Sequence, residues 1–452
     1  VRAANDVSIT SRGSVTIGGR LQAFAGDLAL TASGSLTING TQPGATTASQ
    51  ATAAPAFLQS PTLISLSAAG GVNVGESSLI QSADASASGG RVSVSSPAAI
   101  TLSGTFVADE QILVSGGTTV TLDGRITTGN LIDVRSGQSG PGNGSISGTF
   151  FAELVTTNPG SSILLRSGSG SGSISLVNSL ITADAQVSLI SPTGSVSHGP
   201  GETISADLIY VRAASGIDVR TNTPEVDFAT TGAGGITVTN LQALTANVTA
   251  VNGPVSITSL GTLTAARVEA LGTSIANSVT LKAQSPDPAK KAHLYIQNMT
   301  ASDQGNLTLT AHGTVTGTAG FIKGNQLTIQ ADNIPTLVTD VNSVNLTTLE
   351  PGSLLLTQIG TRTLTADVAL RDGAVTIDHA LGSLVLNNVR IFTNSDDDDL
   401  TVSAGGSIQI GQVFLGDFYS TAAELPSAGA GAVSGHIALG DISLKSGGSV
   451  TQ

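Results

Sequence analysis

The sequence predicts an all-β protein folded as a β-solenoid, a stack of coils of roughly 19–20 residues each. Three observations support this prediction. Apolar-x-apolar triplets recur along the chain, the offset between neighbouring triplets is often eight, and equivalent triplets return at a longer and nearly constant step. The side chains are also small, because the 452 residues include 55 glycines, no tryptophan and only 3% aromatic residues. Such a composition suits a narrow core that is repeated many times.

The triplets have the pattern of short strands. Side chains alternate between the two faces of a strand, so Val7 and Ile9 share one face and Ser8 lies on the other. Val15 and Ile17 repeat this pattern at an offset of eight. The same offset separates residues 28–30 from 36–38, 64–66 from 72–74, 92–94 from 100–102, 112–114 from 120–122, and 400–402 from 408–410.

The longer step indicates stacked coils. Val92 and Ile112 are related by a step of 20, and near 205–280 a step of 19 dominates, as between Ile236 and Val255. Strands this short cannot bury an apolar face alone, but stacking one coil on the next makes the core continuous. Glycines are expected at the corners, where a positive φ is needed. These are Gly13, Gly26, Gly70, Gly71, Gly116, Gly117, Gly234, Gly235, Gly405 and Gly406.

A string of β-sandwich domains is the alternative architecture. It would need about seven strands per ~100 residues and bulky packing between sheets, which the regular step and the scarcity of aromatic residues disfavour. We therefore expect one continuous solenoid over residues 1–452, an internal part of a longer chain. Loops are expected to leave the coils near 41–61, 284–293 and 416–436, of which 284–293 has a helix-like, lysine-rich composition.

Composition also limits the function. No run of 18 apolar residues is present, so no membrane-spanning helix is expected. The net charge of −13 argues against nucleic acid as a partner, because phosphate binding needs clustered lysine and arginine. The chain has no cysteine and therefore no disulfide or thiol chemistry. The five histidines are dispersed and lack zinc-ligand spacing, so each is expected at the surface or in a turn.

Three stretches of sequence resemble the repeats of filamentous-haemagglutinin-like exoproteins. They are GDLALTASGSLTI at 26–38, ASGIDVR at 214–220 and GNLTLTAHGTVT at 305–316. The resemblance implies a right-handed parallel β-helix exported by two-partner secretion and located outside the cell or on a bacterial surface. It implies an adhesive, structural role, with glycans or proteins of host cells, neighbouring cells or the matrix as partners, and with other copies of the chain as a further partner. It carries over no functional residue.

An acidic loop is the sharpest charge cluster. Asp396, Asp397, Asp398 and Asp399 follow one another directly. Carboxylates in a loop can offer several oxygens to Ca²⁺. The other interpretation is a solvated corner that discourages lateral pairing, and it is favoured because no calcium-repeat motif is present. No cofactor other than this candidate Ca²⁺ is expected.

Two further groups are candidates for partner binding. Lys282, Lys290 and Lys291 are three of five lysines, and Tyr295 follows them. They would suit an anionic glycan or a protein partner, although a solvated loop is the favoured interpretation. The aromatic residues Phe414, Phe418 and Tyr419 would suit a sugar or a partner, although packing of the loop at 416–436 onto the solenoid is favoured.

The sequence thus favours a non-enzymatic structural or adhesive rod. The alternative is a β-helical polysaccharide-active enzyme, which would need paired carboxylates and aromatic platforms that this composition supplies sparingly. A self-assembling sheath or surface-layer subunit is a third interpretation.

Overall fold

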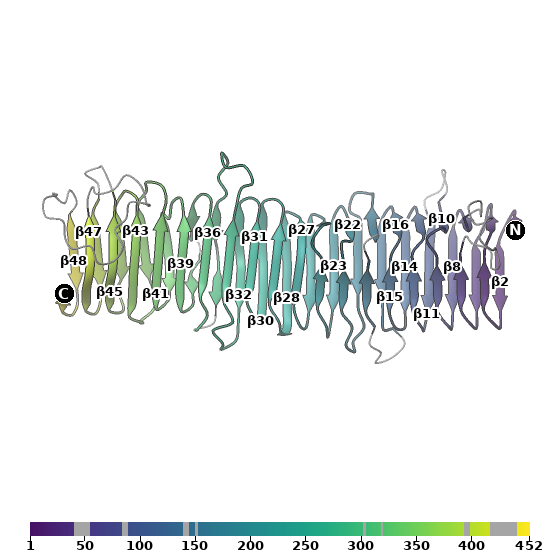
Figure 1. The fold of residues 1–452 in the computed structure, drawn as a ribbon, viewed down its shortest axis with the longest axis horizontal. Coiled ribbons are helices and arrows are strands. Elements are labelled where there is room, and N and C mark those ends of the chain that lie inside the picture. Colours follow the sequence, from purple (N-terminus) through teal and green to yellow (C-terminus); the bar gives the residue numbers. More distant parts are fainter. Residues whose placement is uncertain are drawn as a thin grey trace, which may run out of the picture. The chain divides into compact units, whose positions relative to one another are not determined.

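A computed structural model describes residues 1–39, 55–83, 89–138, 144–149, 152–301, 304–317, 320–392, 398–415 and 441–452. The chain divides into two compact units, unit 1 (Val1–Gly234) and unit 2 (Gly235–Gln452). All elements of the described ranges are β-strands, and their pairing is parallel. Within each unit, strands of successive coils lie side by side (Figure 1). The predicted all-β parallel solenoid is therefore confirmed.

Unit 1 has three strands in most coils, and each strand pairs with its equivalent in the next coil to form one of three ladders. The first ladder contains β2 (Val7–Ser11), β5 (Leu28–Ala32), β8 (Leu63–Ala68), β11 (Arg91–Ser96), β14 (Gln111–Gly116), β17 (Leu131–Arg135), β20 (Ser162–Arg166), β23 (Gln186–Ser191), β26 (Leu208–Ala213) and β28 (Glu225–Ala233). The second contains β3 (Val15–Ile17), β6 (Leu36–Ile38), β9 (Val72–Val74), β12 (Ile100–Leu102), β15 (Val120–Leu122), β18 (Ile146–Gly148), β21 (Ile174–Leu176), β24 (Val196–His198) and β27 (Ile217–Asn222). The third contains β1 (Arg2–Ala3), β4 (Arg20–Ala23), β7 (Phe57–Ser60), β10 (Leu79–Ser82), β13 (Thr105–Ala108), β16 (Arg125–Thr128), β19 (Glu153–Thr156), β22 (Leu180–Thr182) and β25 (Ile204–Ser205).

Unit 2 has two ladders. One contains β29 (Ile236–Asn240), β31 (Val255–Ser259), β33 (Val279–Ala283), β36 (Leu307–Ala311), β39 (Gln326–Ala331), β41 (Ser343–Thr348), β43 (Leu364–Leu370), β45 (Leu384–Ile391), β47 (Ile408–Leu415) and β49 (Val450–Thr451). The other contains β30 (Leu244–Asn252), β32 (Leu263–Ala270), β34 (Leu294–Ile296), β35 (Met299–Ala301), β37 (Val315–Thr316), β38 (Ile322–Lys323), β40 (Thr336–Asp340), β42 (Leu354–Gln358), β44 (Val375–His379), β46 (Leu400–Ala404) and β48 (Ile442–Ser446).

The change of repeat style expected near 205–280 begins inside unit 1, at β27. The first residues of this strand pair with β24, and its last residues pair with β25. One strand therefore continues two ladders, and the corner that separated them in the coil below is lost. The ladder step varies as well: it is shorter than 19 residues between Ile209 and Val226 and longer than 20 residues between Leu263 and Leu294. The predicted pairing of Val92 with Ile112 is confirmed.

The core follows the predicted alternation. In β11 the residues alternate between the inside and the outside, and the inward residues of successive coils stack into columns. One fully buried column consists of Val92, Ile112, Ile132, Ile163, Val187 and Ile209. Each such side chain contributes roughly 1.5–3 kcal/mol through burial, so aliphatic residues alone can fill this narrow interior.

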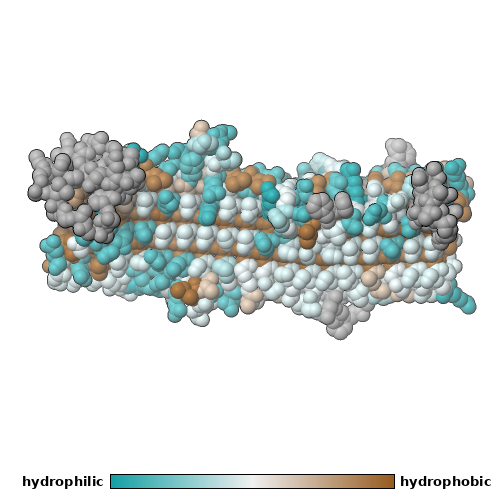
Figure 2. All heavy atoms as spheres, in the orientation of Figure 1, coloured by the Kyte–Doolittle hydropathy of each residue, from teal (hydrophilic) through white to brown (hydrophobic). Residues whose placement is uncertain are grey.

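The outward face consists mainly of short polar side chains. Figure 2 shows pale rows of intermediate hydropathy on the visible face of each unit, with narrow hydrophobic bands between them. This is the surface expected when Ser and Thr occupy the outward positions of each triplet.

Two sequence-based expectations need correction. Residues 57–60, inside the expected loop 41–61, form β7, because buried Leu58 and Ser60 complete the third side of the coil and the Ser60 hydroxyl donates to the Gly26 carbonyl at 2.8 Å. The segment 284–293 is not helical. It forms a turn, because Pro286 and Pro288 lack the N–H groups a helix needs and Asp287 accepts hydrogen bonds from the residues that follow.

Most of the predicted corner glycines lack the expected positive φ. Gly71 has the expected positive φ, at +112°. Gly26 and Gly405 do not, but a Cβ on Gly26 would overlap Asp6 and one on Gly405 would overlap the carbonyl of Ala380. Glycine is needed at these two corners because neighbouring coils approach each other backbone to backbone.

Candidate functional site

A cleft with two arginines lies on unit 1 where β17 and β20 end. It encloses about 390 Å³ and is lined by the residues that end the two strands and begin the following loops, together with Pro192. We call it the arginine cleft, and its lining side chains are Arg135, Gln138, Arg166, Ser167, Ser169 and Pro192. None of the described residues that line it is acidic.

Buried serines hold the loops beside this cleft, and one of them, Ser167, also lines it. Ser136, Ser167 and Ser191 lie at the ends of three neighbouring strands of the first ladder, β17, β20 and β23. The Ser136 hydroxyl donates to the Gly144 carbonyl at 2.8 Å. The hydroxyls of Ser167 and Ser191 both donate to the Gly172 carbonyl, at 2.9 and 2.8 Å. Each serine therefore fastens a glycine-rich loop to the end of a strand.

Glycines allow these loops to pack closely. A Cβ on Gly172 would overlap the Gly144 carbonyl, and one on Gly144 would overlap Gly137. Gly137 itself has φ of +69°, a conformation that favours glycine. The segment at 167–173 is thus a turn held by specific contacts at both ends.

The charges in the arginine cleft are unevenly balanced. Asp133 binds Arg135 through both carboxylate oxygens, with N···O distances of 2.7, 2.9 and 3.1 Å, and these hydrogen bonds raise the pKa of Arg135 above its ordinary value. Among the residues that the structure describes, Arg166 has no acidic partner. Two guanidinium groups and one carboxylate leave this part of an acidic chain with a local positive charge.

A third arginine continues the same surface. Arg212 is in register with Ile190, which is in turn the partner of Arg166. Its guanidinium stacks on Tyr210 at 3.9 Å from the ring centroid and pairs with Asp227 at 2.9 Å. Arg212 is therefore engaged by an aromatic ring and a carboxylate, in contrast to Arg166.

The predicted lysine group is not a single site. Lys282 is exposed on β33, in a different ladder from the strand β34 that carries Tyr295. Lys291 bridges two coils, because its Nζ donates to Asp332 at 2.6 Å and to Glu350 at 2.7 Å. Lys290 lies 4.0 Å from Asp287. The lysines with close acidic partners therefore have structural contacts that a ligand would have to displace.

Tyr295 and Phe414 are both exposed. Tyr295 is 42% exposed, and its ring stacks on His293 with 6.0 Å between ring centroids. Phe414 on β47 is also 42% exposed and is in register with Arg390. Phe418 and Tyr419, like the rest of the predicted loop at 416–436, lie outside the described residues.

The described carboxylates of the acidic loop accept hydrogen bonds from backbone amides. Asp398 is buried, and its Oδ1 accepts from the Gly373 amide at 3.1 Å. The Oδ1 of Asp399 accepts from the Asp441 amide at 2.9 Å. Asp396 and Asp397 lie outside the described residues. Within the described ranges, no group of three or more His, Asp or Glu side chains is arranged to hold a metal ion.

Two histidines are buried, contrary to the expectation that all five lie at the surface or in turns. His198 ends β24, and His379 ends β44, each with its ring inside the coil. Each Nε2 contacts a carbonyl oxygen at 2.7 Å, that of Ser179 for His198 and that of Arg362 for His379. Burial lowers the pKa of His198, and the nearby positive charge of Arg220 lowers it further.

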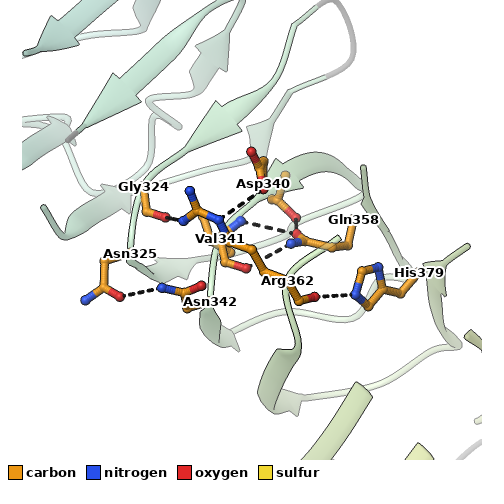
Figure 3. Close-up of polar contacts among 9 residues, drawn as sticks. Gly324, Asn325, Asp340, Val341, Asn342, Gln358, Arg362 and His379 are labelled. Atoms are coloured by element: carbon orange, nitrogen blue, oxygen red, sulfur yellow. Dashed lines mark hydrogen bonds and ion pairs between the residues drawn. The ribbon is translucent and has the colours of Figure 1, made fainter. Parts of the chain in front are cut away.

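His379 belongs to a network of polar contacts that joins successive coils of unit 2 (Figure 3). Buried Gln358 donates from Nε2 to the Val341 carbonyl at 2.8 Å and accepts from the Thr339 hydroxyl at 2.7 Å. Arg362 donates to the Gly324 carbonyl at 3.2 Å. The network satisfies polar groups at a corner between coils, which indicates a structural role.

An asparagine ladder borders this network. Asn342 donates from Nδ2 to Asn325 Oδ1 at 2.9 Å, and Asn325 donates to Asn306 Oδ1 at 3.2 Å. The three side chains therefore connect three successive coils. The amide contact between Asn325 and Asn342 is drawn in Figure 3.

Sequence reasoning missed the arginine cleft. The sequence did contain a signal. Each arginine directly follows an apolar-x-apolar triplet, Arg135 after residues 132–134 and Arg166 after residues 163–165, so aligning the two triplets aligns the two arginines. The distance in sequence between the two arginines exceeds the regular step of the coils, so the loops had to be placed before Arg135 and Arg166 could be aligned.

Comparisons with known proteins supply no relative. No family model, no curated protein and no solved structure matches the chain. No helix long and apolar enough to cross a membrane occurs in the described ranges.

Proposed function

We propose that this chain is a non-enzymatic structural segment of an extracellular or surface-located bacterial protein, and that its adhesive contacts are made on the sides of the coils. The observation that carries the proposal is the uninterrupted pairing within each unit. In unit 1, the first ladder joins ten successive strands without a missing pair.

This architecture suits a spacer. Each coil is hydrogen-bonded to its neighbours and shares their core, so stability accumulates along the stack and local bending is resisted. The outward residues are short and polar, and they recur from coil to coil in the same register. Weak contacts made by such a repeated surface would gain strength by acting together. The resemblance to filamentous-haemagglutinin-like repeats supports the same role.

Surface labelling of the producing cells tests the location. Antibodies raised against the chain should label intact cells, and treatment of those cells with an external protease should remove the label. Labelling found only after permeabilisation would contradict the proposal.

A binding assay tests the role. Beads coated with the chain should adhere to host-cell monolayers or matrix more strongly than beads coated with a soluble globular protein of similar charge. Turnover of any member of a panel of neutral and acidic polysaccharides would instead favour the polysaccharide-active enzyme.

A further inference from the structure

The arginine cleft places two cationic side chains on neighbouring coils. Arg135 and Arg166 are the last residues of β17 and β20 and are direct register partners. Adjacent strands in a sheet are about 4.8 Å apart, so the two side chains start from backbone positions at this separation. Like charges directly opposite each other on neighbouring strands are unfavourable, and a bound anion would relieve that repulsion.

Hydrogen-bond donors remain available in this cleft. A guanidinium group has five N–H donors. Arg135 uses its Nε and Nη2 groups on Asp133, and its Nη1 group has no acceptor among the described residues. Arg166 is exposed and makes no side-chain hydrogen bond or ion pair within the described ranges. Asp133 therefore neutralises one arginine and leaves the other uncompensated.

The walls of the cleft add polar groups without adding negative charge. Ser169 and Gln138 are exposed at its rim. The Ser167 hydroxyl is already bound to the Gly172 carbonyl, so its contribution is to hold the wall in place. The volume of about 390 Å³ is within the range of small-ligand sites and would admit a sulfated or phosphorylated sugar.

We propose that the arginine cleft binds the oxyanion of a sulfate or phosphate group, with Arg166 as its main ligand and Arg135 as the second. Guanidinium groups match such oxyanions through paired N–H donors. Two neighbouring guanidinium groups can each offer paired N–H donors, which suits a tetrahedral group with several acceptor oxygens better than a carboxylate with two. This site is independent of the structural role proposed above, so either proposal can fail alone.

Titration calorimetry with the whole chain tests the site. The probes are inorganic sulfate, inorganic phosphate, dextran sulfate, and neutral dextran as the uncharged control. We expect binding of the anionic probes, at least tenfold weaker in Arg166→Gln and reduced to a smaller degree in Arg135→Gln. Arg166→Lys keeps the charge but loses the paired donors, and it should give an intermediate loss.

Arg91→Gln is the matched control. Arg91 is exposed on β11, in the same ladder of unit 1 but outside the cleft, and its substitution changes the net charge by the same amount. Binding should be unchanged in this variant. Equal weakening in Arg91→Gln and Arg166→Gln would indicate general electrostatic attraction and would overturn the proposal, as would failure of every anionic probe to bind.

The probes also distinguish the source of the anion. Arg166-dependent binding of dextran sulfate that is much tighter than that of free sulfate identifies the group as part of a polymer. Equal affinity per sulfate group identifies a site for the free ion. Circular dichroism of the two Arg166 variants should match that of the parent chain, because Arg166 is exposed and its side chain supports no other described residue.

Discussion

The imidazole of His198 is hydrogen-bonded to the preceding coil, because its Nε2 lies 2.7 Å from the carbonyl oxygen of Ser179. A carbonyl only accepts, so Nε2 carries the proton and the neutral ring is already able to make this contact. The histidine lies where β24 turns toward β25, and Arg220 donates to the Gly201 carbonyl of the same corner at 3.0 Å.

We predict that protonation of His198 destabilises unit 1. Burial lowers its folded-state pKa below the ordinary value of 6.5, so the unfolded state binds the proton more readily. Well above pH 6.5 the ring is neutral in both states, and the free energy of unfolding does not depend on it. As the pH falls below 6.5, this free energy should fall by up to about 1.4 kcal/mol per pH unit until the folded-state pKa is reached.

Denaturant unfolding of the parent chain and of His198→Gln between about pH 5 and 8 measures this effect. Glutamine can donate to the same carbonyl but does not titrate, so its pH dependence should be shallower below pH 6.5. Identical slopes for the two proteins would show that His198 is not responsible.

Loss of the Gln358 side chain, which belongs to the network in Figure 3, should destabilise unit 2. It is only 2% exposed, and Gln358→Ala would remove hydrogen bonds to Val341 and Thr339 that no water can easily replace. We expect a loss of about 2–3 kcal/mol in the free energy of unfolding. Gln330→Ala, at an exposed position of β39, should change it by less than about 0.5 kcal/mol. Similar effects for the two variants would contradict the structural importance of the network.

The asparagine ladder predicts an effect that depends on position. Asn325 has two ladder hydrogen bonds, whereas Asn306 has one within the ladder. Asn325→Ala should therefore destabilise unit 2 by about 1–2 kcal/mol, roughly twice the effect of Asn306→Ala. Thermal unfolding and amide hydrogen exchange in β39 and β41 would measure the difference. An equal loss in both variants would mean that the amides act separately.

A glycine substitution tests the close packing of the loops beside the arginine cleft. In Gly172→Ala the new methyl group would overlap the Gly144 carbonyl, so a backbone shift is required. We expect a loss of at least about 2 kcal/mol in the free energy of unfolding. Gly19→Ala is the control, because no atom lies within 4 Å of its Cβ position. If Gly172→Ala were tolerated as well as Gly19→Ala, the loops would be less tightly packed than the structure indicates.

Much of the fold could be predicted from the sequence because it depends on a local pattern. The alternation around Val92 and Val94 gives both strand and facing, and the step to Ile112 gives the register. β7 was missed because its second inward residue is Ser60, whose burial is made possible by a hydrogen bond to Gly26 in another coil. A long-range contact of this kind leaves no trace in local periodicity.

The candidate site could not be predicted for a similar reason. Arg135 and Arg166 become neighbours only when two loops of different composition are placed outside the coil. Lys291 looked like a free cation in the sequence, whereas its partners Asp332 and Glu350 are 41 and 59 residues away. The partners of a charged residue depend on how the coils stack, and the local sequence does not show this stacking.

Strand β27 pairs with both β24 and β25, so it joins a coil in which these two ladders have separate strands to a coil in which they share one. Ile217 continues the ladder of Val196, and Thr221 continues that of Ile204. A step of four residues within β27 therefore reaches the same two ladders as the step of eight residues from Val196 to Ile204. The cross-section can therefore change while both ladders keep their main-chain partners. Residues 196–222 therefore contain the whole transition from a coil in which two strands serve these two ladders to a coil in which one strand serves both.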